Sequence, residues 1–144
     1  MLTQVHAIVV AATLIALIAS VILHCMAATF LMRRFEGASA HQSACMVMMV
    51  LGLFIAHVVE IWLFGVTSWS LAQVDGAGAV VGGEVSGLTD YIYFSAVTYT
   101  TLGYGEVYPV GPIRFIFGTE ALIGFMLITW SASVTFLQMQ RFWR

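Results

Sequence analysis

The stretch of sequence that decides the fold is LTDYIYFSAVTYTTLGYGE, residues 88–106. Its first part, residues 88–100, is apolar and aromatic, but a helix of this length is too short to cross a lipid bilayer. The second part has glycines at alternate positions, Gly103 and Gly105, and glycine accepts positive φ angles without strain. An alternation of ordinary and glycine residues can turn successive carbonyl groups to the same side. We therefore predict a short helix followed by an extended run that presents its backbone carbonyl groups.

Long apolar segments lie on both sides of this stretch. Residues 5–32, 44–65 and 112–137 are each long and apolar enough to span a membrane as a helix. The chain is 61% hydrophobic and only 8% charged, whereas soluble domains carry about 25% charged residues. Non-helical backbone at membrane depth must be buried in protein or line water. The sequence therefore predicts an all-α membrane protein with three transmembrane helices and a re-entrant helix and loop.

The arginines predict the orientation of the chain in the membrane. Arg33 and Arg34 lie between the first two spans, and Arg141 and Arg144 follow the third. Because basic loop residues favour the cytoplasmic side, we expect the N-terminus outside and the C-terminus in the cytoplasm. The loop of residues 66–111, which carries acidic residues and no basic residue, is then external. The first span is longer than the apolar region of a secretory signal, so we expect it to be retained.

A spacing of threonines and glycines gives the stretch a family resemblance. The pattern T-x-x-T-x-G-Y-G is formed by Thr98, Thr101, Gly103, Tyr104 and Gly105. Between two membrane spans, this pattern resembles the signature sequence of the potassium-channel pore family. The resemblance implies a tetrameric pore whose four identical subunits each supply one strand of a selectivity filter.

The resemblance also implies a division of the chain. Residues 43–144 would form the pore domain, with an outer helix at 44–65, a pore helix at 88–100 and a filter at 101–105. Residues 112–137 would form its inner helix. Residues 1–42 would form an extra N-terminal membrane helix and a cytoplasmic loop, to which the sequence assigns no role.

The same resemblance assigns roles within the filter. The carbonyl groups of Thr101, Leu102, Gly103 and Tyr104 would bind K+, the Thr101 hydroxyl would form the inner mouth, and Gly105 would complete the outer turn. Rings of backbone carbonyls replace the hydration shell of a potassium ion in this way. Thr98 would support the filter from the pore helix. Leu102 stands where valine is commonest, and we expect little change there because the carbonyl group does the work. Glu106 stands where aspartate is usual, so we expect altered hydrogen bonding behind the filter.

The predicted function is passive, potassium-selective conduction across a bacterial inner membrane. The permeant ion is the only cofactor expected, and the lipid bilayer and three copies of the same chain are the only partners. A net charge of −2 and the absence of lysine argue against nucleic-acid binding, and no soluble substrate is expected. No constellation of residues suggests hydrolysis or redox chemistry, so we expect no enzyme activity. The alternatives are a less selective cation channel and a non-conducting sensor or accessory subunit with a channel-like fold.

The spans contain ionisable residues, for which we also predict a role, because such residues are rare in membranes and often functional. His57 and Glu60 share a helix face, and Glu120 is expected at a similar depth in the third span. We predict a polar network that braces the filter, in which Glu120 bonds His57 or the pore helix and Arg114 pairs with Glu60 or Glu106. The alternative is a set of separate groups that snorkel or stay protonated. A metal site at His57 and Glu60 is a weaker hypothesis, because two ligands from one helix are too few.

The inner helix carries the remaining candidates. Gly124 approximates the glycine at which some channels of the family bend, or else marks a close helix contact. Thr129 and Ser133 share a face and are candidates for lining a central cavity. No span has arginines at every third position, so we expect no voltage sensor of the usual kind.

Overall fold

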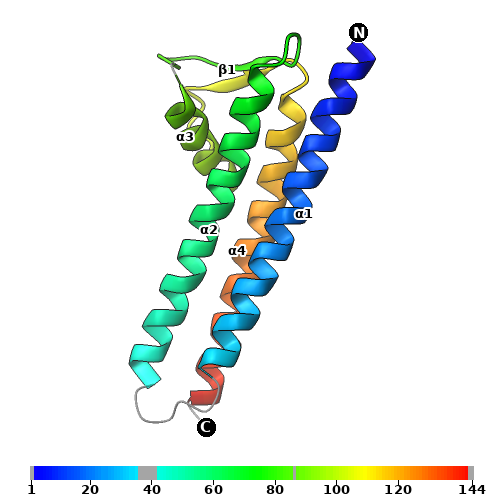
Figure 1. Cartoon of the computed structure of the whole chain (residues 1–144). Helices are drawn as coiled ribbons and strands as arrows, with labels where there is room; N and C mark the ends of the chain where they lie inside the picture. Colours follow the sequence, from blue (N-terminus) through cyan, green and yellow to red (C-terminus); the bar gives the residue numbers. More distant parts are fainter. Residues whose placement is uncertain (1, 36–41, 86, 143–144) are drawn as a thin grey trace.

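Three long helices run side by side along the whole length of the molecule (Figure 1). The computed structural model describes residues 2–35, 42–85 and 87–142. The helices are α1 (Leu2–Arg34), α2 (Gln42–Ala72) and α4 (Arg114–Phe142), and all three are long and apolar enough to cross a membrane. The predicted class, a helical integral membrane protein with three spanning helices, is confirmed.

The outer helix is longer than the sequence suggested. α2 continues to Ala72 rather than ending near residue 65. Hydroxyl residues in its last turns do not stop it, because they bond back to carbonyl groups of the same helix. Thr67 Oγ1 donates to the Leu63 carbonyl at 2.6 Å, and Ser70 Oγ donates to the Val66 carbonyl at 2.8 Å. The chain turns only afterwards, where Gly76 adopts a φ of 83°.

The short helix α3 (Leu88–Tyr99) lies at the end of the molecule where α2 ends and α4 begins (Figure 1). Gly87 is its N-cap, and the Gly87 amide donates to Asp90 Oδ2 at 3.0 Å. α3 packs against α2 and α4, while α1 packs against α2 and α4 on its own side. Gly65 makes the α2–α3 contact possible, because a Cβ there would lie 2.8 Å from Ile92 Cα. The short helix is therefore held among the long ones.

A small sheet beside α3 was missed by the sequence prediction. Strand β1 (Ala79–Val81) comes from the glycine-rich loop and pairs antiparallel with β2 (Tyr108–Val110), with Val80 opposite Pro109. The Val80 amide also donates to the Tyr91 hydroxyl at 3.2 Å. The sheet therefore fixes the loop before α3 to the segment that leads into α4.

The outer surface of the bundle is apolar. Ile15, Phe54 and Leu122, one from each long helix, are 69%, 62% and 64% exposed in the single chain. Side chains of this kind are stable only against lipid or other subunits. The exposed faces thus fit a subunit that lies in a membrane.

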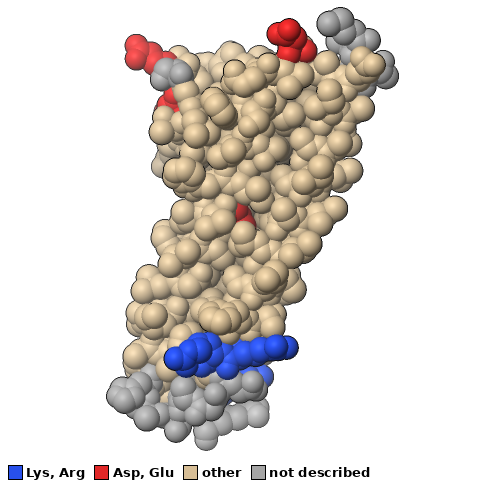
Figure 2. Space-filling model, viewed as in Figure 1, with Lys and Arg blue, Asp and Glu red and all other residues tan. Residues whose placement is uncertain are grey.

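Most exposed charged residues separate along the long axis of the molecule (Figure 2), with Arg114 at the start of α4 as an exception at the acidic end. Arg33 and Arg34 end α1 and Arg141 lies near the end of α4, so the basic band lies at one end. The exposed acidic residues Asp75 and Glu84 belong to the loop at the other end. This is the separation on which the predicted orientation depends. Arg144, which also entered that prediction, lies outside the described residues, as do residues 36–41 of the predicted cytoplasmic loop.

Candidate functional site

The segment after α3 leaves the helix by a distinct backbone path. The Leu102 amide donates to the Val97 carbonyl at 3.0 Å, and the Gly103 amide to the same carbonyl at 3.3 Å. From Thr101 onward, positive φ angles recur at every second residue: 58° at Thr101, 57° at Gly103 and 84° at Gly105. Thr101 is the single non-glycine residue with positive φ in the described part of the chain. Left-handed conformations are costly for threonine, so a strained backbone is concentrated at the start of this run.

The whole run from Thr100 to Glu106 is exposed in the single chain. Leu102 and Tyr104 are 56% and 65% exposed, although their side chains are apolar or aromatic. Between this run and α3 lies a cavity of about 410 Å³, lined in part by Thr98, Thr101 and Tyr104. The segment with the predicted ion-binding residues thus presents an uncovered surface rather than a closed site.

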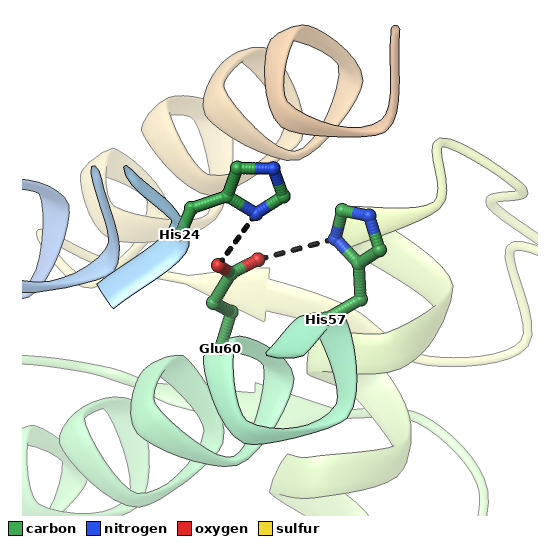
Figure 3. A group of neighbouring side chains, drawn as sticks. All are labelled: His24, His57 and Glu60. Carbon is green, nitrogen blue, oxygen red and sulfur yellow. Dashed lines mark hydrogen bonds and ion pairs between the residues drawn. The ribbon is translucent and has the colours of Figure 1, made fainter. Parts of the chain in front are cut away.

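A buried group of polar side chains lies at the inner end of α3. Tyr99, the last residue of α3, donates its hydroxyl proton to Glu60 of α2, and both residues are fully buried. Two histidines flank the Glu60 carboxylate (Figure 3): His24 Nδ1 lies 3.0 Å from Oε1, and His57 Nδ1 lies 3.2 Å from Oε2. Ser131 of α4 completes the group, with its Oγ 3.0 Å from His57 Nε2 and 3.2 Å from His24 Nε2. We call these five side chains the Glu60 cluster.

The Glu60 cluster joins every helix of the protein. His24 comes from α1, His57 and Glu60 from α2, Tyr99 from α3 and Ser131 from α4. The predicted network at His57 and Glu60 therefore exists in part, but three of its members were missed. The polar character of His24 inside an apolar span was the available signal, and the sequence could not show which helix it would face.

Glu120 belongs to a different contact. It is fully buried in α4 and bonds Ser95 of α3, whose Oγ also lies 2.8 Å from the Ile61 carbonyl. A serine has one proton and the Ile61 carbonyl can only accept. Both contacts are satisfied when Ser95 donates to Ile61 and a protonated Glu120 donates to Ser95. Glu120 thus bonds the pore helix, one of its two predicted partners, and no hydrogen bond joins it to His57 among the described residues.

The predicted pairing of Arg114 is wrong for Glu60, because that carboxylate is enclosed by histidines and Tyr99. Arg114 is exposed at the start of α4, and within the described ranges it forms no ion pair with Glu106 either. Glu106 instead accepts a hydrogen bond from the Tyr93 hydroxyl of α3. That hydrogen bond raises the pKa of Tyr93 above its ordinary value. Residues 101–105, which were predicted to form the filter, are called the filter run below. Glu106, the residue after this run, is tied to α3 and not to α4.

The inner-helix candidates occupy two kinds of position. Gly124 is buried, and a Cβ there would collide with the Tyr99 carbonyl oxygen. α4 is continuous through Gly124, which marks a close contact between α4 and the end of α3. Thr129 and Ser133 are exposed in the single chain, and the Ser133 hydroxyl donates to the Thr129 carbonyl at 3.0 Å.

A half-length helix and an exposed, glycine-alternating run between two membrane-spanning helices define a subunit of a membrane pore. Comparison with known proteins agrees with this class. Residues 44–141, more than half of the chain, match the family model described as an ion channel. The chain therefore belongs to this ion-channel family, and the predicted membership of the potassium-channel pore family is confirmed.

Curated relatives share parts of the chain. It is 28% identical over 90 residues to "Inward rectifier potassium channel Kirbac3.1" of Paramagnetospirillum magnetotacticum. This alignment covers 62% of this chain and 30% of that protein. It is 41% identical over 49 residues to "Protein LctB" of Geobacillus stearothermophilus, which covers 34% of this chain and 37% of that protein. The chain thus spans about a third of the length of each relative. No solved structure is significantly similar to the chain.

Proposed function

We propose that this chain is the pore subunit of a potassium-selective channel and that four copies surround one conduction pathway. The observation that carries the proposal is the alternation of positive φ angles at Thr101, Gly103 and Gly105, directly after a half-length helix. Such an alternation can turn successive carbonyl groups to one side. The carbonyl groups of residues 101–104 would then replace water around a dehydrated K+ ion.

The exposure of the filter run supports assembly around an axis. One chain contributes one strand, which cannot surround an ion alone. Leu102 and Tyr104 would be covered by neighbouring subunits, and the exposed apolar residues of α4, including Phe125 and Met126, would meet the same neighbours or the pore. A homotetramer closes four such strands into a filter.

The position of α3 supports cation selectivity at the inner side of the filter. α3 begins beside the acidic loop and ends at Tyr99, deep between α2 and α4. Its C-terminal end carries about half an elementary negative charge from the aligned peptide dipoles. Four such ends would stabilise a cation in a central cavity, which Thr129 and Ser133 would line. The N-terminus of the chain would be external and the C-terminus cytoplasmic, because the basic band would then face the cytoplasm.

The test is the current through purified protein in a planar bilayer, with potassium on one side and sodium on the other. The proposal requires a reversal potential near the potassium equilibrium value. A reversal potential near zero with measurable current would favour a less selective cation channel. No current at acidic, neutral and alkaline pH would favour the non-conducting alternative.

A matched pair of glycine variants distinguishes an effect on the filter from a general effect on folding. Gly103→Ala places a side chain at a φ of 57° within the filter run, and should abolish selective current. Gly87→Ala is the control, since Gly87 has an extended φ of −173° and a Cβ at this position would meet no atom within 4 Å. This control should keep the reversal potential of the original chain. Equal loss in both variants would contradict the filter assignment.

A further inference from the structure

The Glu60 cluster contains three side chains of the kinds that bind metal ions: two histidines and a glutamate. One ligand atom from each of His24, His57 and Glu60 can be chosen so that all of them lie within 4.8 Å of one another. His24 and Glu60 are fully buried, and His57 is 16% exposed in its side chain. We propose that His24, His57 and Glu60 bind one divalent transition-metal ion of the zinc type in each subunit.

The donor set has the chemistry that such an ion prefers. Imidazole nitrogen and carboxylate oxygen are ordinary ligands of Zn²⁺, and three protein ligands leave a fourth position open. The Tyr99 hydroxyl lies 2.9 Å from His57 Nδ1 and bonds Glu60, so a further oxygen atom lies next to two of the three ligands. The sequence suggested a metal site with only two ligands from one helix, which are too few. In the structure His24 of α1 is the third ligand.

The distances leave room for an ion after a small adjustment. Zinc binds nitrogen and oxygen at about 2.0–2.2 Å, so ligand atoms on one tetrahedral ion lie about 3.3–3.5 Å apart. In the Glu60 cluster the two nitrogen–oxygen contacts measure 3.0 Å and 3.2 Å. Both imidazoles already direct Nδ1 toward the carboxylate (Figure 3). Because the two contacts end on different carboxylate oxygens, one ion would be reached by both Nδ1 atoms after a turn of the Glu60 carboxylate that brings one oxygen between them.

A count of protons leaves one contact of the cluster without a proton when Glu60 is ionised and both histidines are neutral. Five hydrogen-bond contacts form a closed ring: Glu60–His24, His24–Ser131, Ser131–His57, His57–Tyr99 and Tyr99–Glu60. An ionised Glu60 and two neutral histidines give this ring four protons, one each from the histidines, the serine and the tyrosine. One contact is therefore left without a proton. A metal ion would supply a positive charge at this contact and take the Nδ1 lone pairs of both histidines.

Ser131 is placed as the outer partner of such a site. With Nδ1 of each histidine on the metal, both Nε2 atoms carry a proton and become donors. Both Nε2 atoms lie within 3.2 Å of the Ser131 Oγ, which has two lone pairs to accept them. Outer partners of this kind orient metal-binding histidines. The metal-bound state thus leaves no histidine nitrogen without a partner.

The ion would connect the extra helix to the pore. His24 lies 36 positions before Glu60, and its bond to the carboxylate is the polar link between α1 and α2 in this cluster. A metal ion would replace that hydrogen bond with a stronger bond. Metal binding at these three residues does not depend on whether the pore conducts potassium.

The experiment measures zinc bound to the purified full-length chain in detergent, after removal of any affinity tag and treatment with a chelator. Equilibrium dialysis against ZnCl₂ followed by elemental analysis should give one zinc per subunit. Cobalt substitution should give the intense visible absorption of a tetrahedral site. Absence of bound zinc above the level of a chelator-treated blank would overturn the proposal, and would leave an extra proton as the group that fills the ring.

Variants identify the ligands. His24→Ala and Glu60→Gln should each weaken zinc binding by at least tenfold, and Ser131→Ala, which keeps all three ligands, should weaken it by about 10–100-fold. The matched control is His6→Ala, a histidine on the same helix outside the cluster, which should retain one zinc per subunit. Retention of stoichiometric zinc by both His24→Ala and Glu60→Gln would show that the metal binds elsewhere and would refute the site.

Discussion

Tyr99, at the inner end of α3, donates its hydroxyl proton to Glu60, which lies 39 positions earlier on α2. Thr101, where the filter run begins, follows two residues later, so this bond fixes the base of the run to the outer helix. Glu60 in turn contacts His24 of α1. Two hydrogen bonds therefore connect α1, through Glu60, to the end of α3 from which residues 101–105 continue. In this way the structure gives the first helix a physical role that the sequence did not suggest.

We expect Tyr99→Phe to destabilise the assembled protein and to reduce ion selectivity. The substitution keeps the ring but removes a buried hydrogen bond to a carboxylate, which contributes about 1.5–3 kcal/mol. Thermal unfolding in detergent and the reversal potential in bilayers would measure the two effects. Tyr108→Phe is the control, since the Tyr108 side chain is 55% exposed. A Tyr99→Phe protein as stable as the control would refute the anchoring role.

Glu120 should tolerate glutamine better than alanine. The amide of Glu120→Gln can donate to Ser95 as a protonated acid would, so we expect a change within about 1 kcal/mol. Glu120→Ala removes the contact between α4 and α3 and leaves a void, so it should destabilise by about 2–3 kcal/mol. Denaturation of both variants in the same detergent would compare them. A strongly destabilising Glu120→Gln would indicate that the ionised carboxylate is required.

Tyr93 provides a prediction of pH dependence. Its hydrogen bond to Glu106 raises its pKa from the ordinary value of 10.0, so the bond contributes fully at neutral pH. The contribution is lost as the pH rises through the raised value in the folded protein. The difference in absorbance between the original chain and Tyr93→Phe would follow the ionisation of this phenol alone. Glu106→Gln should move that ionisation to lower pH, and an unchanged titration would contradict the assignment.

Most of the architecture could be predicted from the sequence because it depends on local properties. Apolar length identified the three spanning helices, and the glycine spacing at Gly103 and Gly105 identified the run after α3. The pairing of β1 with β2 was not predictable, because strands of three residues carry almost no pattern. Gly78 illustrates this: it has a φ of 95°, and a Cβ there would collide with the Val110 carbonyl oxygen, which becomes evident only when the two strands meet.

The sequence could predict which residues of the candidate site lie together only when those residues belong to the same helix. His57 and Glu60 share a face of α2, so their proximity follows from helix geometry. The partnership with His24 depends on how α1 rotates against α2, and no periodicity determines this, because α1 is apolar on all sides. The predicted pairing of Arg114 with Glu60 was wrong because the depth of Glu60 was misjudged. α2 continues to Ala72, so Glu60 lies well inside the bundle beside Tyr99, whereas Arg114 lies at the outer start of α4.

Gly124 yields a prediction about the contact between the inner helix and the filter base. Gly124→Ala would direct a methyl group at the Tyr99 carbonyl group, whose carbon would lie 2.9 Å from the new Cβ. The atoms that the new Cβ would meet belong to Tyr99, so either α4 or the end of α3 must shift to make room. Overpacking of this kind destabilises by about 1–3 kcal/mol, so we expect a lower unfolding temperature together with altered selectivity.

Gly118→Ala on the same helix is the matched control for this substitution. No heavy atom lies within 4 Å of a Cβ at Gly118, and alanine favours helix over glycine by up to about 1 kcal/mol. The control should therefore be neutral or slightly more stable than the original chain, with unchanged selectivity. If Gly124→Ala also proved neutral, α4 would have room to shift at this point, and Gly124 would act as a bending point rather than as a close contact.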